Sequence, residues 1–271
     1  MIIIKTITKV FQKSIIVSHF NTYPIEKELK GSIQNVVLKP TPKTTTHAWD
    51  INPKQSQKYL IFLHGTAQNI SCNQSLYKKI ISSTDFGILV PEYRGFGNNP
   101  DAIISKKTLS QDMNSAFNYL IQKGIKPQNI YSAGHSFGTY PAAQIATKNK
   151  ISKLILISPI ECALTGMKNY AKKLRINMIN KKAFFLCENS RIIERYFESF
   201  FNITKFTKKC ETPIDIIHSK GDSLIENGKF YKIAKTCKNL HNVRVLSEGT
   251  HKLDEPKIDE LVKILKEEFY G

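Results

Sequence analysis

The sequence lacks long apolar runs, which argues against a membrane-spanning protein. No stretch of its 271 residues approaches the roughly 18 consecutive apolar residues that a transmembrane helix needs. Residues 1–17 are partly apolar, but lysines interrupt them every few positions and no clear small-residue cleavage site follows. We therefore expect no secretory signal peptide there, and predict a strand or an amphipathic edge helix instead.

Motifs that hold metals or phosphates are also missing. The chain has no HExxH sequence and no cluster of carboxylates, so we expect no metal site. No GxxxxGK(S/T) or GxGxxG loop is present to cradle a phosphate. The odd number of scattered cysteines, with no CxxC pair, is typical of reduced thiols in a reducing compartment: Cys72, Cys162, Cys187, Cys210 and Cys237.

Acidic residues are scarce relative to basic ones. The chain has 40 lysines and arginines against 22 aspartates and glutamates, a formal net charge of +18. A lysine-rich solvated surface explains this charge, and so does attraction to an anionic membrane surface. Nucleic acid is not expected as a partner, because no zinc-finger spacing, aromatic RNA-binding motif or isolated basic tail occurs. We predict a cytoplasmic protein, with peripheral membrane attachment as the open alternative.

From residue 59 onward, short apolar runs alternate with helical patterns. Buried strands are predicted at residues 59–63, 87–90, 129–133, 153–158, 214–219 and 243–247. Thr108 and Gln111 are a candidate capping box for the helix after the second strand, and Gly124 marks its end. Its apolar face consists of Leu109, Met113, Ala116, Phe117, Leu120 and Ile121. A terminal helix is predicted from Ile258, Leu261, Val262, Leu265 and Phe269. This alternation predicts an α/β fold with a mostly parallel sheet and helices on both faces.

Two segments depart from the alternation. Residues 1–58 are expected to form an antiparallel lead-in, with Pro40 and Pro42 marking a loop. Residues 161–210 carry two amphipathic helical patterns and eleven Lys or Arg against four Asp or Glu, a net charge of +7. This insertion is either two ordinary helices packed on the core or a small lid whose aromatic face lines an apolar pocket. In both cases we predict a single domain over residues 1–271.

The pentapeptide GHSFG at residues 134–138 is the first candidate for chemistry. A lone GxSxG occurs often by chance, but here it follows a predicted strand and opens a predicted helix. That context places Ser136 on a sharp turn with its hydroxyl exposed, and small residues at positions 134 and 138 allow the turn. We therefore predict Ser136 as a catalytic nucleophile.

A serine hydroxyl is a weak nucleophile until a base takes its proton. His251 and Asp222 each follow a predicted strand, and the carboxyl ends of parallel strands meet at one edge of a sheet. The chain order serine, acid, histidine predicts His251 as general base and Asp222 as its orienting carboxylate. Asp215, inside a strand, is the weaker candidate acid.

Other nearby polar residues are interpreted as structural. We expect His135, beside the serine, to be a packing residue. Asp254 and Glu255 lie close to His251 in sequence, but they begin a helix and are expected to cap it. His19, His47, His218 and His241 have no comparable placement and are interpreted as structural or surface residues.

An oxyanion hole needs two backbone N–H groups. One is expected from Phe137, directly after the nucleophile, and the other from Thr66 in the loop HGTAQNIS after the first core strand. Ala67 is the alternative donor if the turn is offset by one residue.

The segments YLIFLHGTAQNIS, PEYRGFGNNP and GHSFGT, followed by HSKGD and GTH, together resemble one group of known proteins. They are similar to the abhydrolase-domain serine hydrolases of the α/β-hydrolase superfamily, which include protein depalmitoylases and lipid-cleaving enzymes. The resemblance covers roughly residues 45–271, and this chain departs from it at Thr66, Gln68 and Glu92 and in a longer stretch after residue 158. It implies the α/β-hydrolase fold, no cofactor and a small-molecule or lipid-like acyl substrate.

The expected activity is hydrolysis of a carboxylic ester or thioester through an acyl-enzyme. The alternative is a catalytically weak protein that keeps the fold and binds at a membrane surface. A decayed site usually loses a triad member or an elbow glycine, and this sequence has lost neither. The sequence therefore favours a working enzyme.

Overall fold

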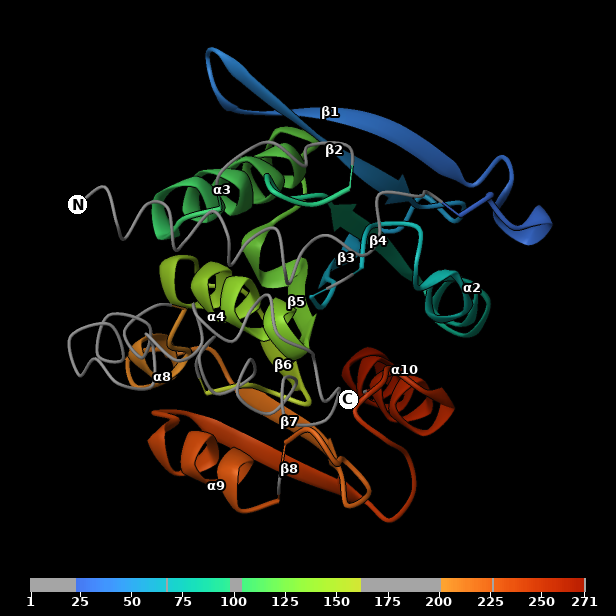
Figure 1. The fold of residues 1–271 in the computed structure, drawn as a ribbon. Coiled ribbons are helices and arrows are strands. Elements are labelled where there is room, and N and C mark those ends of the chain that lie inside the picture. Colours follow the sequence, from blue (N-terminus) through green and yellow to red (C-terminus); the bar gives the residue numbers. More distant parts are fainter. Residues whose placement is uncertain (1–22, 67, 98–103, 162–200, 226, 271) are drawn as a thin grey trace, which may run out of the picture.

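The described part of the chain, residues 23–66, 68–97, 104–161, 201–225 and 227–270 of a computed structural model, is organised around one sheet. Its strands are β1 (Ile33–Thr41), β2 (Thr44–Ile51), β3 (Lys58–Leu63), β4 (Phe86–Pro91), β5 (Ile130–His135), β6 (Lys153–Ile157), β7 (Ile214–Ser219) and β8 (Leu240–Leu246). They lie in the order β1-β2-β4-β3-β5-β6-β7-β8, from the top to the bottom of Figure 1. All six strands predicted from the sequence are present.

The sheet is mostly parallel, as the sequence predicts. The six strands β4, β3, β5, β6, β7 and β8 pair in parallel with their neighbours in this order. In contrast, β2 pairs antiparallel with both β1 and β4. The antiparallel lead-in is therefore confirmed for the described residues, but Pro40 was wrongly placed in a loop. It lies inside β1, where an edge strand tolerates a missing N–H group, and the turn that follows contains Pro42.

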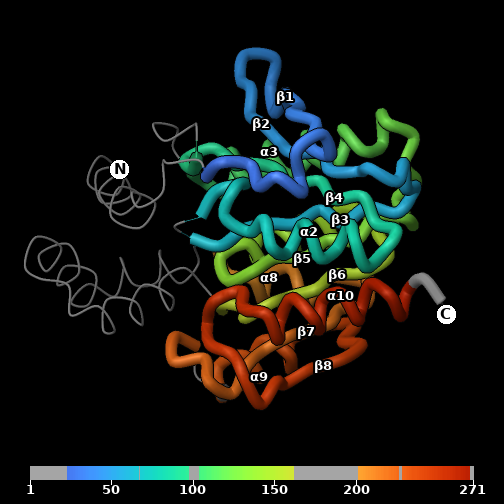
Figure 2. Tube along the Cα trace, turned by 90° about the vertical axis from the view of Figure 1, so that its right-hand side faces the viewer, coloured from blue at the N-terminus to red at the C-terminus, as the bar shows by residue number. Residues whose placement is uncertain are grey.

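Helices cover both faces of the sheet. Figure 2 shows α2 (Gln74–Ser83) and α10 (Glu255–Tyr270) on one face, in front of the strands. The other face carries α3 (Lys106–Gln122), α4 (Thr139–Lys148) and α9 (Asn227–Thr236), with the short α8 (Thr204–Thr207) against α4 and α9. Each face has its own cluster of buried apolar side chains, so the predicted α/β architecture is confirmed.

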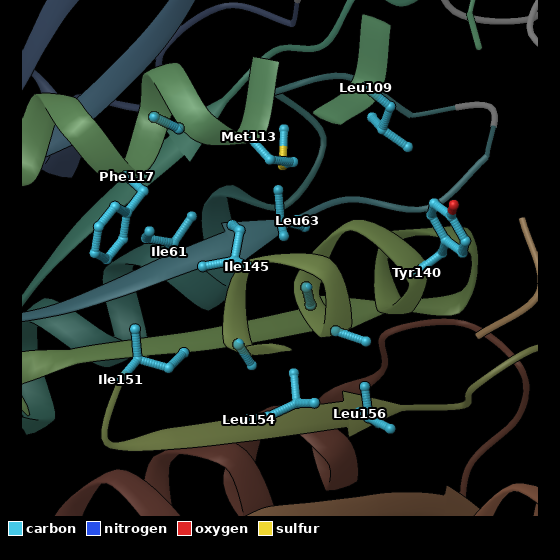
Figure 3. Close-up of a cluster of buried hydrophobic side chains, with 14 of the residues drawn as sticks. Ile61, Leu63, Leu109, Met113, Phe117, Tyr140, Ile145, Ile151, Leu154 and Leu156 are labelled. Carbon is cyan, nitrogen blue, oxygen red and sulfur yellow. The ribbon is translucent and has the colours of Figure 1, made fainter. Parts of the chain in front are cut away.

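The core under α3 and α4 fixes the elements that carry the candidate nucleophile. In Figure 3, Met113 of α3 lies above Ile61 and Leu63 of β3, and Ile145 of α4 lies beside them. All four are at most 1% exposed. Burial of one such side chain stabilises the fold by about 1.5–3 kcal/mol. Each helix and strand therefore turns the face that carries its apolar side chains toward the core.

The start of α3 differs from the prediction. Its capping box is formed by Ser105 and Thr108: Ser105 Oγ accepts the Thr108 N–H at 3.0 Å, and the Ser105 N–H donates to Thr108 Oγ1 at 2.7 Å. The expected pair of Thr108 and Gln111 was wrong, because Gln111 Oε1 accepts a hydrogen bond from Arg94 at 3.0 Å. Gly124, with φ of +88°, lies just beyond the helix as predicted.

Several predictions fall on residues outside the described part. These are residues 1–22 and residues 162–200, which contain most of the insertion, with Cys162 and Cys187; the lid stays a prediction. Cys72, Cys210 and Cys237 are free thiols. Of the helices described, none is long and apolar enough to cross a membrane.

Candidate active site

The GHSFG pentapeptide forms a sharp turn between β5 and α4. Ser136 directly follows β5 and adopts φ of +54°, a conformation that is rare and strained for residues other than glycine. A Cβ atom on Gly134 would lie 2.1 Å from the carbonyl oxygen of Gly138, and one on Gly138 would lie 2.1 Å from that of Leu63. Neither position can hold a side chain, so the two glycines permit the strand–turn–helix geometry that a nucleophile elbow requires.

The structure brings Ser136, His251 and Asp222 into one hydrogen-bonded chain. His251 Nε2 lies 2.9 Å from Ser136 Oγ, and His251 Nδ1 lies 2.9 Å from Asp222 Oδ2. The three residues follow β5, β8 and β7, so three loops converge at the carboxyl edge of the sheet. The carboxylate assigns the proton to Nδ1, which leaves Nε2 to accept the proton of the serine hydroxyl.

Asp222 is held as a carboxylate. Its Oδ1 accepts the backbone N–H groups of Leu224 at 2.9 Å and Ile225 at 2.8 Å, and the residue is 5% exposed. Burial opposes its ionisation, but the hydrogen bond and charge of His251 outweigh burial and hold the pKa of Asp222 below its usual value. Asp222 is therefore ionised at neutral pH.

The other candidate acid, Asp215, lies at the far end of β7. Its carboxylate pairs with Lys153 Nζ at 3.5 Å and with His241 Nδ1 at 2.7 Å. Asp215 lies four positions before Ser219, the last residue of β7, which corresponds to roughly 13 Å along the strand. Asp215 is therefore part of an ion-pair cluster away from Ser136.

The loop after β3 lies against the nucleophile elbow, where the predicted oxyanion donors belong. Gly138 packs on the end of β3, and a Cβ atom on Gly65 would lie 3.4 Å from the carbonyl oxygen of His135. Thr66 and Phe137, both partly exposed, therefore lie on adjoining segments beside Ser136. The alternative donor, Ala67, falls outside the described residues. Donation by Thr66 and Phe137 stays a prediction.

Comparisons with known proteins agree with this architecture. The family model described as alpha/beta hydrolase fold matches residues 58–188. An esterase structure from Pyrococcus furiosus superposes with a TM-score of 0.69 over 91% of this chain and 94% of that one, at 17% sequence identity. This chain has the α/β-hydrolase fold.

Two curated relatives extend the comparison of this α/β-hydrolase-fold chain. A protein of Acanthamoeba polyphaga mimivirus, named as an alpha/beta hydrolase, is 26% identical over 224 residues. The match covers 79% of this chain and 76% of the viral protein. Human alpha/beta hydrolase domain-containing protein 17B is 27% identical over 179 residues, covering 66% of this chain. The match spans only 54% of that human protein's length. The resemblance to abhydrolase-domain proteins is confirmed.

Gln68, at which this chain departs from the abhydrolase-domain pattern, holds the loop after β3. Gln68 Oε1 accepts the Gly65 N–H at 2.8 Å, and Gln68 Nε2 donates to Asn73 Oδ1 at 3.3 Å. The glutamine therefore orients the backbone directly before Thr66. The sequence gives no sign of this role beyond the position of Gln68 in HGTAQNIS, because a side-chain hydrogen bond within a loop has no periodic pattern.

A buried polar network supports the same loop from β4. His64 Nε2 lies 2.8 Å from Glu92 Oε1, and both side chains are at most 4% exposed. Tyr93 donates its hydroxyl hydrogen to the His64 carbonyl, and its ring stacks on the His64 ring at a centroid distance of 4.3 Å. Glu92, which differs from the family's aspartate, therefore links the PEYRGFG segment to the predicted oxyanion loop.

His135, expected to be a packing residue, also makes a specific bond to the loop that carries His251. Its Nε2 donates to the backbone carbonyl of His251 at 2.8 Å. Burial, followed by repulsion from His251, lowers the pKa of His135 to about 3, so the ring is neutral at pH 7. A neutral ring that donates from Nε2 has a fixed tautomer, and it ties β5 to the segment that carries His251.

His218 lies behind Asp222 at the end of β7. Its ring is buried and stacks on Phe230 at 4.3 Å, and its Nε2 lies 3.2 Å from the Ile225 carbonyl. Burial lowers its pKa. His218 therefore supports the turn of residues 222–225, in agreement with a structural role.

Aromatic rings border the elbow. Phe137 packs between Phe96 at 5.8 Å and Phe201 at 5.2 Å, and Phe201 also contacts Tyr140 at 5.0 Å. Phe201 is the first described residue after the main part of the insertion. An apolar wall therefore lies beside Ser136.

The described residues contain no group of three or more His, Cys, Asp or Glu side chains that could hold a metal ion.

Proposed function

We propose that this protein is a serine hydrolase that cleaves carboxylic esters or thioesters of an acyl substrate. The observation that carries the proposal is the continuous chain from Asp222 through His251 to Ser136, with 2.9 Å at both steps. The strained φ of Ser136 adds to it, because strain at a non-glycine residue is typical of a nucleophile elbow.

The geometry supports acyl transfer in two halves. In the first, Ser136 Oγ gives its proton to His251 Nε2 and bonds to the carbonyl carbon, while the N–H groups of Thr66 and Phe137 stabilise the oxyanion. The bond to the alcohol or thiol then breaks, and the leaving group takes the proton from His251. In the second, water gives a proton to His251 and attacks the acyl-enzyme, which releases the acid and returns the proton to Ser136.

The alternative is a catalytically weak binding protein. It requires a damaged site, whereas every proposed catalytic side chain here has its expected hydrogen-bond partner. The two are separated by labelling with a fluorophosphonate probe, which forms a covalent bond only with an activated serine. Stoichiometric labelling, blocked in the Ser136→Ala variant and followed by turnover of p-nitrophenyl esters, supports the enzyme. Absence of labelling in folded wild-type protein contradicts it.

The aromatic wall leads to a prediction about the acyl chain. We expect p-nitrophenyl esters with medium or long chains to have higher kcat/KM than the acetate. Each methylene buried against the partly exposed Phe137, which Phe96 and Phe201 support from behind, contributes roughly 0.8 kcal/mol. A series from acetyl to palmitoyl, measured below the aggregation limit of each ester, gives the test. A clear optimum at acetyl contradicts an apolar pocket and leaves the triad unaffected.

The basic surface leads to a second proposal, peripheral binding to anionic membranes. Lys205 of α8 and Lys208, which directly follows it, are exposed, and α8 contacts both α4 and α9. Beyond these helices, Lys238 Nζ pairs with Glu211 Oε1 at 2.8 Å. This hydrogen bond, more than the charge of Lys150, lowers the pKa of Glu211. Such a surface is expected to attract anionic lipid.

We expect sedimentation with phosphatidylserine vesicles at low salt and loss of binding at high salt, because exposed charges are screened within about 10 Å at 0.1 M salt. The double variant Lys205→Glu/Lys208→Glu is expected to weaken binding. The matched control Lys263→Glu/Lys266→Glu reverses two exposed charges on α10, on the opposite face of the sheet. An equal loss of vesicle binding in both variants indicates that net charge alone, and not the surface around α8, determines binding. If wild-type protein does not bind vesicles at low salt, the proposed membrane surface is rejected.

A further inference from the structure

The peptide groups on both sides of His251 are held by buried side chains. The carbonyl of His251 accepts a hydrogen bond from His135 Nε2 at 2.8 Å. The carbonyl of the preceding residue, Thr250, accepts one from Lys257 Nζ. Because peptide groups are planar, the two that flank an α-carbon set its backbone angles and therefore the direction of its side chain. Fixing both carbonyls fixes the direction of the His251 Cα–Cβ bond, from which the imidazole extends.

Lys257 occupies an unusual position for a lysine. It lies in the first turn of α10, and its side chain is 0% exposed. Lysine is almost never fully buried without a partner, because an uncompensated interior charge is strongly destabilising. Its partner is Asp254, with Oδ1 3.0 Å from Lys257 Nζ. Asp254 lies three residues and Lys257 six residues beyond His251, so this ion pair lies beside the segment that carries His251.

Asp254 completes the attachment of the loop. Its Oδ2 accepts the Thr250 N–H at 2.6 Å and lies 3.3 Å from Thr250 Oγ1. Asp254 therefore binds the N–H of Thr250 while Lys257 binds its carbonyl. The predicted helix start is confirmed, because Asp254 directly precedes α10 and Glu255 begins it. The Asp254 carboxylate bonds to the Thr250 N–H and to Lys257 Nζ.

The loop backbone is shaped to receive this carboxylate. Gly249 has φ of +95°, and a Cβ atom there would lie 2.9 Å and 3.0 Å from the two Asp254 oxygens. A side chain at this position would displace the carboxylate. The glycine therefore allows Asp254 and Lys257 to contact the segment that carries His251.

We propose that Lys257 is a positioning residue for the general base, which together with Asp254 keeps His251 Nε2 within hydrogen-bond distance of Ser136. This inference rests on the proposed function, in which His251 is that base. The Asp254 carboxylate balances the ammonium charge, so the pair holds the loop without strongly opposing the imidazolium that forms during catalysis. The chemical steps themselves belong to Ser136, His251 and Asp222.

The test compares two buried lysines. Lys257→Met keeps most of the side-chain volume and removes the charge and both hydrogen bonds. Lys153→Met is the matched control, because Lys153 is 4% exposed and pairs with Asp215 and Glu268 far from Ser136. We expect Lys257→Met to lower kcat by roughly 10- to 100-fold with KM within about threefold, since a small displacement of a catalytic group has this effect. For Lys153→Met, kcat per folded protein is expected within about twofold of wild type.

A spectroscopic readout makes the test independent of turnover. The proton shared by His251 Nδ1 and Asp222 gives a downfield proton NMR signal, assigned by its loss in His251→Ala. We expect this signal to broaden or disappear in Lys257→Met and to persist in Lys153→Met. If Lys257→Met does not fold, Asp254→Asn is expected to produce a smaller loss of kcat and the same broadening.

The outcomes separate the two proposals. If Ser136→Ala abolishes turnover but a folded Lys257→Met retains wild-type kcat and an intact downfield signal, the positioning role is wrong and the proposed function stands. Equal losses of kcat in Lys257→Met and Lys153→Met also reject it. If Ser136→Ala keeps its activity, the proposed function itself has failed.

Discussion

The Ser136→Ala variant is expected to lose ester hydrolysis by about six orders of magnitude in kcat, as removal of the nucleophile does in other serine enzymes. The hydroxyl supplies the atom that bonds to the acyl carbon, and no neighbouring group can replace it in that step. Alanine keeps the Cβ atom that already exists at φ of +54°, so the elbow and the fold are expected to persist. Single-turnover hydrolysis of an activated ester measures the loss of activity, and the far-UV circular dichroism spectrum measures whether the fold persists.

The control for this variant is Ser158→Ala. Ser158 follows β6, the strand beside β5, and has a φ of +46° and a fully buried side chain. The control therefore applies the same substitution in a similarly strained backbone next to the site, but outside the proposed triad. Its kcat is expected within a few-fold of wild type. Activity of Ser136→Ala within about tenfold of wild type would reject Ser136 as nucleophile.

Much of the fold could be predicted because local patterns and long-range packing agree. The apolar runs at residues 59–63 and 153–158 are buried on both faces in β3 and β6, as strands covered by helices on both sides must be. The triad could be predicted for a related reason. Chain order and strand ends determine which loops meet at the carboxyl edge of a parallel sheet, so Ser136, Asp222 and His251 had to lie near one another.

The supporting contacts could not be predicted in the same way. Gln68, Glu92 and Lys257 act through side-chain bonds whose partners depend on loop conformation, and loop conformation has no periodicity to reveal it. Asp254 illustrates the problem, since its position before α10 predicts a cap while the nearby Thr250 N–H competes for the same carboxylate. Sequence therefore locates the candidate catalytic groups at strand ends better than it locates the side chains that bond to their loops.

The Asp222→Asn variant is expected to fold and to lose roughly 10⁴-fold in kcat. Asparagine is close in shape to aspartate and can still accept the N–H groups of Leu224 and Ile225 through its carbonyl oxygen. Its uncharged amide no longer stabilises the His251 imidazolium, and an NH₂ group facing Nδ1 favours the tautomer with the proton on Nε2. That tautomer cannot accept the Ser136 proton.

Asp215→Asn is the matched control, because it makes the same change in a buried aspartate of the same strand and loop unit. Asp215 pairs with Lys153 and His241 at the far end of β7, so its loss is expected to lower the melting temperature while kcat of the folded protein stays within a few-fold of wild type. Measurement of kcat, normalised to the folded fraction, separates the two effects. A large fall in kcat for Asp215→Asn with little change for Asp222→Asn would reverse the assignment of the acid, and the hydrogen bond of 2.9 Å between His251 and Asp222 would then be only structural.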